Sequence, residues 1–233
     1  MCGRFSQFSS VNDLVSTFSV DESLVDDDDI GPRWNVAPTQ QVIVVATSKE
    51  GATRRLGTMR WGLVPNWAKD PSIGNRMINA RADKVASSSA FRSAFRSRRC
   101  IVPADGFYEW HKQVDQHGKK APSVPFHVHA SDREPLALAG LWEVWHDAEG
   151  LPMRSFTIIT VDPNSTMAAI HDRMPVILDP TDWDRWLSPE PLDDEEQVAM
   201  LCPAPDELLV LDRVSTRVNN TRNEGPDLIE AVR

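Results

Sequence analysis

The sequence predicts an α+β fold in which a mostly antiparallel β-sheet curls toward a barrel and is flanked by helices. Many short segments are rich in β-branched and apolar residues, which is typical of strands. A few helical segments lie among them without a regular alternation of strand and helix, and this irregular order favours α+β. Because the 233 residues contain no repeats and no convincing boundary, we expect one domain over residues 1–233.

The first third of the chain predicts one helix and one hairpin. Residues 11–18 are amphipathic and predict a short helix, with Ser10 or Asn12 as its cap. An acidic surface loop and a turn at residues 34–39 follow. Two strands, at 41–46 and 54–61, pair through a hairpin with Gly51 at its tip, and a loop rich in Trp, Pro and Gly covers 61–67.

The remainder of the chain predicts further strands separated by helices. Helices are expected at residues 82–97, 165–170 and 181–187, the last one capped by Thr181. Strands are expected at residues 100–103, 106–110, 126–130, 136–144, 156–161 and 208–214.

Composition predicts a soluble, cytoplasmic protein. No apolar run is long enough to span a membrane, and the N-terminus lacks the pattern of a signal peptide. The three cysteines, Cys2, Cys100 and Cys202, are widely spaced, which argues against a disulfide framework and against a structural zinc site. No combination of cysteine and histidine has the spacing of metal ligands. We therefore expect no metal, no cofactor and a monomer.

Charge is distributed unevenly along the chain. The formal net charge is −9, but the acids concentrate in residues 21–29 and 190–196. Between these stretches lies a basic segment opposed only by Asp83, and its cations are Arg76, Arg81, Lys84, Arg92, Arg96, Arg98 and Arg99. A local basic face indicates an anionic partner even when the whole chain is acidic. For residues 92–99 a solvated helix face is the alternative.

Cys2 follows Met1, and methionine is removed efficiently when the next residue is small. Removal would give one residue both a free α-amine and a thiol. Such a pair condenses with an aldehyde: the amine forms a Schiff base, and the thiol adds to the imine carbon to close a thiazolidine. With ordinary pKa values of about 8 for the amine and about 8.5 for the thiol, both groups would be partly deprotonated near neutral pH. The alternative is a small residue on an N-terminal strand.

Three further strings carry residues suited to chemistry. Asn79 lies in Asn-Ala-Arg, Glu109 stands among three aromatic residues, and His171 follows an apolar segment. A carboxyl among aromatics is partly desolvated, which raises its pKa toward the range of a general acid–base group. Each residue also has a structural alternative: a turn for Asn79, a surface ion pair for Glu109, and an interior histidine bonded to backbone for His171.

Taken together, these strings resemble the SRAP (SOS response-associated peptidase) family, whose members crosslink covalently to abasic sites in single-stranded DNA. The matching blocks are residues 1–5 (MCGRF), 34–39 (WNVAPT), 61–65 (WGLVP), 78–81 (INAR), 100–110 (CIVPADGFYEW), 170–175 (IHDRMP), and 214–215 with 218–220. They occur in the family's order from residue 2 to about residue 229. None of the chemical positions departs from the family pattern.

The resemblance implies a site made of Cys2, Asn79, Glu109 and His171. Cys2 would capture the aldehyde of the ring-opened deoxyribose, and Glu109 would shuttle protons. His171 would protonate the ring oxygen of the sugar, and Asn79 would position the amine or a sugar hydroxyl. The expected protein is then an enzyme with peptidase-like or lyase-like chemistry that protects lesions in the DNA damage response. Removal of Met1 is either autocatalytic or the work of an ordinary aminopeptidase.

DNA binding is assigned to other residues. Arg4 and Arg81 would bind phosphates, because each lies two positions from a residue of the site. Arg81 and Asn79 would face the same way if they lie on a strand. Trp61 and Trp67 are candidates for stacking on exposed bases, with core packing as the alternative, more so for Trp61.

Two other functions remain open at this point. Glutamine amidotransferases with an N-terminal nucleophile also begin Met-Cys-Gly, and there the thiol would attack an amide carbonyl. The strings around Glu109 and His171 favour abasic-site chemistry over that alternative. A module that binds single-stranded DNA without any covalent step is the second possibility.

Overall fold

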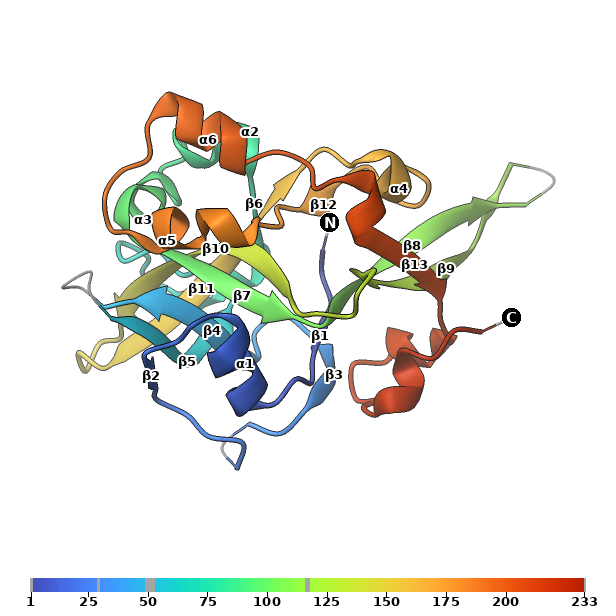
Figure 1. Cartoon of the computed structure of the whole chain (residues 1–233), viewed down its shortest axis with the longest axis horizontal. Helices are drawn as coiled ribbons and strands as arrows, with labels where there is room; N and C mark the ends of the chain where they lie inside the picture. The colour runs from blue at the N-terminus through green and yellow to red at the C-terminus, as the bar shows by residue number, and fades with distance from the viewer. Residues whose placement is uncertain (1, 29, 49–52, 116–117, 233) are drawn as a thin grey trace.

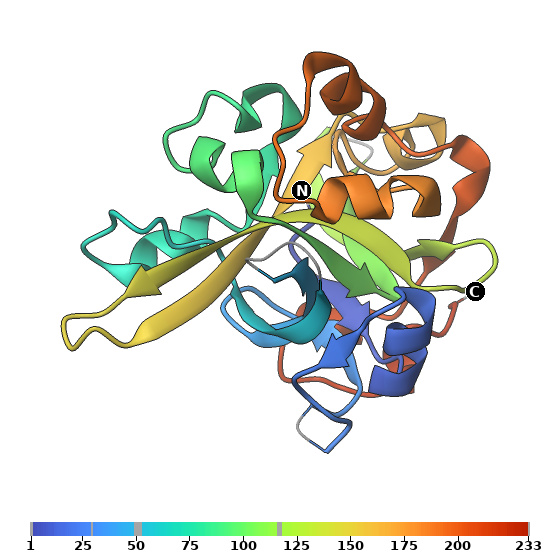
Figure 2. The ribbon, with the colours of Figure 1, turned by 60° about the vertical axis from the view of Figure 1, so that its left-hand side comes forward.

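A closed barrel is the centre of the fold. The computed structural model describes residues 2–28, 30–48, 53–115 and 118–232. The larger sheet has the order β12-β11-β10-β7-β4-β5-β2, and β11 also pairs with β5 in parallel, which closes the barrel (Figures 1 and 2). Its strands are β2 (Glu22–Ser23), β4 (Gln41–Thr47), β5 (Arg54–Trp61), β7 (Arg99–Ala104), β10 (Leu136–His146), β11 (Pro152–Val161) and β12 (Met174–Pro175). The short strand β6 (Asn79–Arg81) pairs in parallel with β11.

A second sheet is entirely antiparallel and carries the N-terminal residues. Its order is β13-β9-β8-β1-β3. The strands are β1 (Phe5–Gln7), β3 (Arg33–Val36), β8 (Gly106–Val114), β9 (Lys120–Ala130) and β13 (Leu209–Arg213). The β8–β9 hairpin extends beyond the other elements in Figure 1. The two sheets and their helices confirm the predicted α+β class.

The helices are short and lie mainly on one side of the barrel. They are α1 (Val11–Thr17), α2 (Ala82–Val85), α3 (Arg92–Ser97), α4 (Ser165–Ala168), α5 (Trp183–Leu187) and α6 (Asp194–Met200). Five 3₁₀ turns are also present among the described residues: η1 (Pro71–Arg76), η2 (Pro180–Asp182), η3 (Asp206–Leu208), η4 (Thr216–Asn219) and η5 (Pro226–Leu228). Figures 1 and 2 both place α3, α5 and α6 on the same side of the barrel. None of the described helices is long and apolar enough to cross a membrane.

Three sequence-based expectations about these elements are wrong. The helix expected at 82–97 is two helices, α2 and α3, because the serines at 87–89 lie between them and side-chain hydroxyls compete for backbone hydrogen bonds. Asp179, not Thr181, caps the turn before α5. Half of the segment 34–39 is not a turn, since Trp34 to Val36 belong to β3. The Ser10 cap of α1 is confirmed, and Gly51 lies outside the described residues.

The core fills the barrel and the space between the barrel and the helices. Trp61, Phe156, Ile101 and Leu138 are fully buried members of this core. A smaller cluster around Tyr108, Val214 and Val218 lies where the C-terminal segment meets the second sheet. The N-terminal residues are thus held between the two sheets.

Candidate functional site

Cys2 lies three residues before the first residue of β1 and is fully buried. Asn79 fixes its position, because Asn79 Nδ2 donates a hydrogen bond of 2.8 Å to the carbonyl oxygen of Cys2. Asn79 is the first residue of β6, where Ala80 is buried and Arg81 is exposed, so Asn79 and Arg81 face the same way. Asn79 Oδ1 is buried and accepts no hydrogen bond from any described residue. A buried acceptor of this kind is suited to a donor that a substrate or a processed N-terminus brings.

Glu109 and His171 approach each other from different parts of the chain. Glu109 lies on β8 and is only 2% exposed. His171 follows α4, where its backbone N–H bonds to the carbonyl of Met167. The distance between His171 Nε2 and Glu109 Oε2 is 3.7 Å, which is an ionic contact and longer than a hydrogen bond. Burial raises the pKa of Glu109, and the proximity of His171 opposes the rise.

The other ring nitrogen of His171 has partners for both protonation states. Nδ1 lies 3.0 Å from the backbone N–H of Arg173, from which a neutral imidazole accepts. The same nitrogen lies 3.1 Å from Asp172 Oδ1, to which a protonated imidazole donates. These contacts orient the imidazole ring of His171.

The thiol of Cys2 lies in a buried environment while Met1 precedes it. Burial raises its pKa well above the ordinary range, and the nearby Glu109 carboxylate raises it further. While Cys2 still follows Met1, the buried environment therefore favours the protonated thiol. The expected partial deprotonation concerns the chain without Met1 and stays a prediction. A buried S–H group can add to an imine only if the proton is passed on as the bond forms.

Arg4 is fastened within the protein. Its Nη1 donates to Asn35 Oδ1 at 2.8 Å and to the Val218 carbonyl at 3.0 Å, and its guanidinium lies over the Trp110 ring. Asn35 is fully buried, and its Nδ2 donates to the carbonyls of Val218, Asn220 and Asn223. This role of Asn35 was missed from the sequence, although Asn35 lies inside one of the matching blocks.

The two tryptophans differ sharply. Trp61 is buried against Phe5 and Phe156, and its indole N–H donates to the Ile78 carbonyl. No face of Trp61 is available to a base, so its proposed stacking on DNA is wrong. Trp67 is 56% exposed and keeps an accessible ring.

Arg81, two residues after Asn79, lines a cavity of about 430 Å³. Arg81 is exposed and forms two hydrogen bonds with Asp83. Arg173, which the sequence analysis did not single out, lines the same cavity and donates to Asp162 and to the Thr160 carbonyl. Its position two residues after His171 was the available signal. No cluster of possible metal ligands occurs among the described residues.

Fold and site together define a barrel-containing α+β protein whose candidate nucleophile is the second residue of the chain. This chain belongs to the SOS response associated peptidase (SRAP) family, whose family model matches residues 1–221. The resemblance seen in the sequence is thereby confirmed.

Relatives and a solved structure agree with this membership. The chain is 41% identical over 231 residues to the abasic site processing protein YoqW of Bacillus subtilis, with 99% of this chain and 100% of that protein covered. It is 32% identical over 230 residues to the abasic site processing protein HMCES of Xenopus tropicalis, with 89% and 68% covered. A crystal structure of a protein from Bacteroides thetaiotaomicron shares the fold, with a TM-score of 0.86, 24% identity, and 99% and 100% coverage.

Proposed function

We propose that this protein captures abasic sites in single-stranded DNA through a thiazolidine formed by Cys2 after Met1 is removed. The observation that carries the proposal is the arrangement of Asn79, Glu109 and His171 around the start of the chain. Asn79 is bonded to Cys2, and Glu109 is close enough to raise the pKa of its thiol. The names of the relatives, abasic site processing proteins, support the same lesion as substrate.

The reaction releases one water molecule overall. His171 protonates the ring oxygen of the abasic sugar while the C1 hydroxyl gives up its proton, so the ring opens to the C1 aldehyde. The α-amine of Cys2 attacks C1 to give a carbinolamine. Glu109 protonates the leaving hydroxyl and then takes a proton from the nitrogen, so water departs, an imine remains and the acid form of Glu109 is restored. The sulfur then adds to C1, and the thiol proton passes to the nitrogen. A raised pKa suits Glu109 to this task, because its acid form persists closer to neutral pH.

Asn79 and Cys2 divide the positioning of the amine. The Asn79 amide already holds the Cys2 carbonyl, and its buried Oδ1 can accept a hydrogen bond from the freed amine or from a sugar hydroxyl. Cys2 is fully buried while it follows Met1. In this proposal, removal of Met1, by the protein itself or by an aminopeptidase, both frees the amine and opens the approach to it.

DNA contacts in the proposal come from Arg4, Arg81 and Trp67. Arg81 is exposed on the same face of β6 as Asn79 and would bind a phosphate beside the lesion. The accessible ring of Trp67 would stack on a neighbouring base, a contact worth about 1–3 kcal/mol. Binding would not depend on base sequence, because the lesion has no base to be read. We further propose that the protein acts as a monomer in the cytoplasm, where its three free cysteines would stay reduced.

Intact mass of the purified protein, before and after incubation with an abasic oligonucleotide, tests the proposal. The expected result is loss of Met1, followed by an adduct of protein and DNA minus one water that survives heat and detergent. Cys2→Ala should form no thiazolidine and at most a reversible Schiff base. A chain that keeps Met1 and still forms the stable adduct would contradict the proposal. Binding without an adduct would favour a non-covalent module, and ammonia released from glutamine would favour an amidohydrolase.

A further inference from the structure

The basic segment between residues 76 and 99 divides into bonded and unbonded cations. Arg99 is buried among backbone carbonyls, Arg98 pairs with Glu143, and Arg81 pairs with Asp83. Arg92 and Arg96 are exposed, and their guanidinium groups bond to no described residue. Arg76 and Lys84 are likewise exposed, and their side chains bond to no described residue. Arg92 and Arg96 differ from these two because they share one helix, where both are available to an anion from outside.

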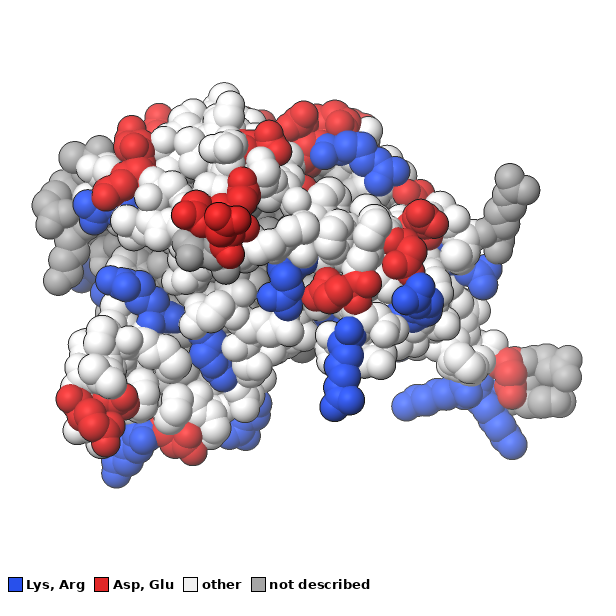
Figure 3. Space-filling view, turned by 90° about the horizontal axis from the view of Figure 1, so that it is seen from below, with Lys and Arg blue, Asp and Glu red and all other residues white. Residues whose placement is uncertain are grey.

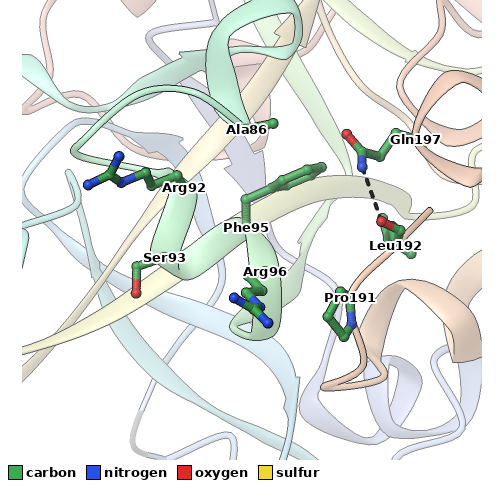
Figure 4. A pocket seen from close by; sticks show the side chains of 8 residues that line it. All are labelled: Ala86, Arg92, Ser93, Phe95, Arg96, Pro191, Leu192 and Gln197. Atoms are coloured by element: carbon green, nitrogen blue, oxygen red, sulfur yellow. Dashed lines mark hydrogen bonds between the residues drawn. The ribbon is translucent and has the colours of Figure 1, made fainter. Parts of the chain in front are cut away.

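Arg92 and Arg96 stand together on α3. Residues four apart lie on the same side of a helix, one turn from each other. With Ser93 they border a cavity of about 540 Å³ that lies between α3 and the segment leading into α6. Figure 4 shows Phe95 pointing from α3 toward Gln197 across this cavity, with the two arginines on the α3 side. We call Arg92, Ser93 and Arg96 the α3 surface.

The α3 surface adjoins the candidate site. Gln197 lines both this cavity and the cavity of about 430 Å³ that holds Arg81 and Arg173. A strand held at Arg81 therefore has a route past Gln197 to α3. Asp194 and Glu195, exposed at the start of α6, would repel phosphates, which favours the α3 side of the route.

We propose that the α3 surface binds phosphates of the same DNA strand, beyond the immediate neighbours of the lesion. This inference rests on the proposed function and extends its substrate from a lesion to a longer stretch of single strand. Two guanidinium groups and a hydroxyl match phosphate oxygens, which accept hydrogen bonds and carry charge. The surface would contribute affinity and leave the chemical step unchanged.

The test compares the wild type with the double variant Arg92→Gln/Arg96→Gln on abasic oligonucleotides of about 5 and about 20 nucleotides. For the long oligonucleotide, the second-order rate of adduct formation should fall about 25-fold at about 0.1 M salt, and its log–log salt slope should flatten by about 1.4. The rate with the short oligonucleotide, and the rate at saturating DNA, should not change. Arg154→Gln/Arg213→Gln removes the same charge from exposed positions elsewhere and should behave as the wild type.

Two results would overturn the inference while leaving the proposed function intact. One is an unchanged rate with the long oligonucleotide, and the other is an equal loss with both lengths. If the wild type forms no adduct, the proposed function itself fails. Fluorescence anisotropy with undamaged oligonucleotides of the same two lengths then still decides the inference. A double variant that loses affinity for the long oligonucleotide but not for the short one would support it. A double variant that binds the long oligonucleotide as tightly as the wild type, or loses affinity equally for both lengths, would reject it.

Discussion

Glu109 is the residue at which burial and chemistry are most closely coupled. Its raised pKa is valuable only if it gives and takes protons, so a neutral isostere should remove activity but keep the shape of the site. Glu109→Gln should lower the adduct rate at saturating DNA by about 100-fold or more. As pH rises through the pKa of Glu109 the acid form is lost, so the wild-type rate should fall there, and this fall should be absent in the variant.

Glu143→Gln is the matched control for this prediction. Glu143 is also a buried carboxyl, on β10, and it bonds to Arg98 away from Cys2. The control should lose stability but keep the saturating rate. A Glu109→Gln protein that forms adduct as fast as the wild type would show that another group moves the protons.

His127 is a buried residue whose effect is on stability. Its Nε2 contacts Ser6 Oγ at 3.0 Å, and burial, with nearby His129, lowers its pKa to about 3. Between about pH 6.5 and that value the unfolded chain binds a proton that the folded chain does not. Stability should therefore fall as pH falls through this window, by up to about 1.4 kcal/mol per pH unit from this group.

Urea unfolding at neutral pH and near pH 4.5 measures the effect. His127→Gln should be less stable near neutral pH but should lose less stability on acidification than the wild type. His146 is exposed at the end of β10, and His146→Gln should lose as much stability between the two pH values as the wild type. Identical acid losses in wild type and His127→Gln would refute the assignment.

At the scale of elements, the long strands could be predicted from sequence and the short ones could not. Residues 42–46 of β4 and 156–161 of β11 are continuous runs of apolar and β-branched residues, a pattern typical of buried strands. Strands β1, β3 and β6 have three or four residues each, and they exist because neighbouring strands pair with them. Their own residues carry little preference, so tertiary pairing decides.

The candidate site shows the same division. Cys2, Glu109 and His171 were candidates because of their reactive side chains, and these assignments remain proposals. Sequence could not show that Asn79 bonds to the Cys2 carbonyl, because residues 2 and 79 meet only in the fold. Trp61 was wrongly placed on the DNA surface, because an unusual tryptophan in a loop motif does not reveal that a carbonyl inside the core accepts its N–H.

Arg99 joins three elements through one side chain, and its replacement should show how far they depend on it. The guanidinium donates to the carbonyls of Phe95, Arg96, Trp186, Ser188 and Glu190. Lysine has too few donors, in the wrong geometry, to serve all five. Arg99→Lys should lower the free energy of unfolding by about 3 kcal/mol, since buried carbonyls lose their partners.

Chemical denaturation measures this loss, with Arg92→Lys as the control. Arg92 is exposed on α3, and its replacement should change stability by less than about 0.5 kcal/mol. Equal stabilities of the two variants would mean that water replaces the lost bonds of Arg99.

For the whole molecule, the distribution of charge matters more than its sum. Figure 3 shows acidic and basic side chains interspersed on the face seen from below. The net charge of −9 therefore describes solubility better than partners, and a nucleic acid can be held by local cations.

The C-terminal segment is connected to the start of the chain through Asn35. Arg4 bonds to both Asn35 and the Val218 carbonyl, so residues near 218 hold the segment that carries Cys2. Asn35→Ala would remove one of the two acceptors for Arg4 and the donor to three carbonyls. We expect the free energy of unfolding to fall by on the order of 3 kcal/mol and the saturating adduct rate to fall about tenfold or more.

Asn35→Asp separates these two effects. An aspartate still accepts from Arg4 but cannot donate to the carbonyls of Val218, Asn220 and Asn223, so stability should fall while the adduct rate stays near that of the wild type. Asn223→Ala removes a side chain of the same segment whose one hydrogen bond within the described part of the chain goes to the Arg217 carbonyl, and it should leave the rate unchanged. Rates are compared at a temperature where every variant is folded. If Asn35→Ala then forms adduct as fast as the wild type, the hold on Arg4 does not position Cys2, and the link between the two ends serves stability alone.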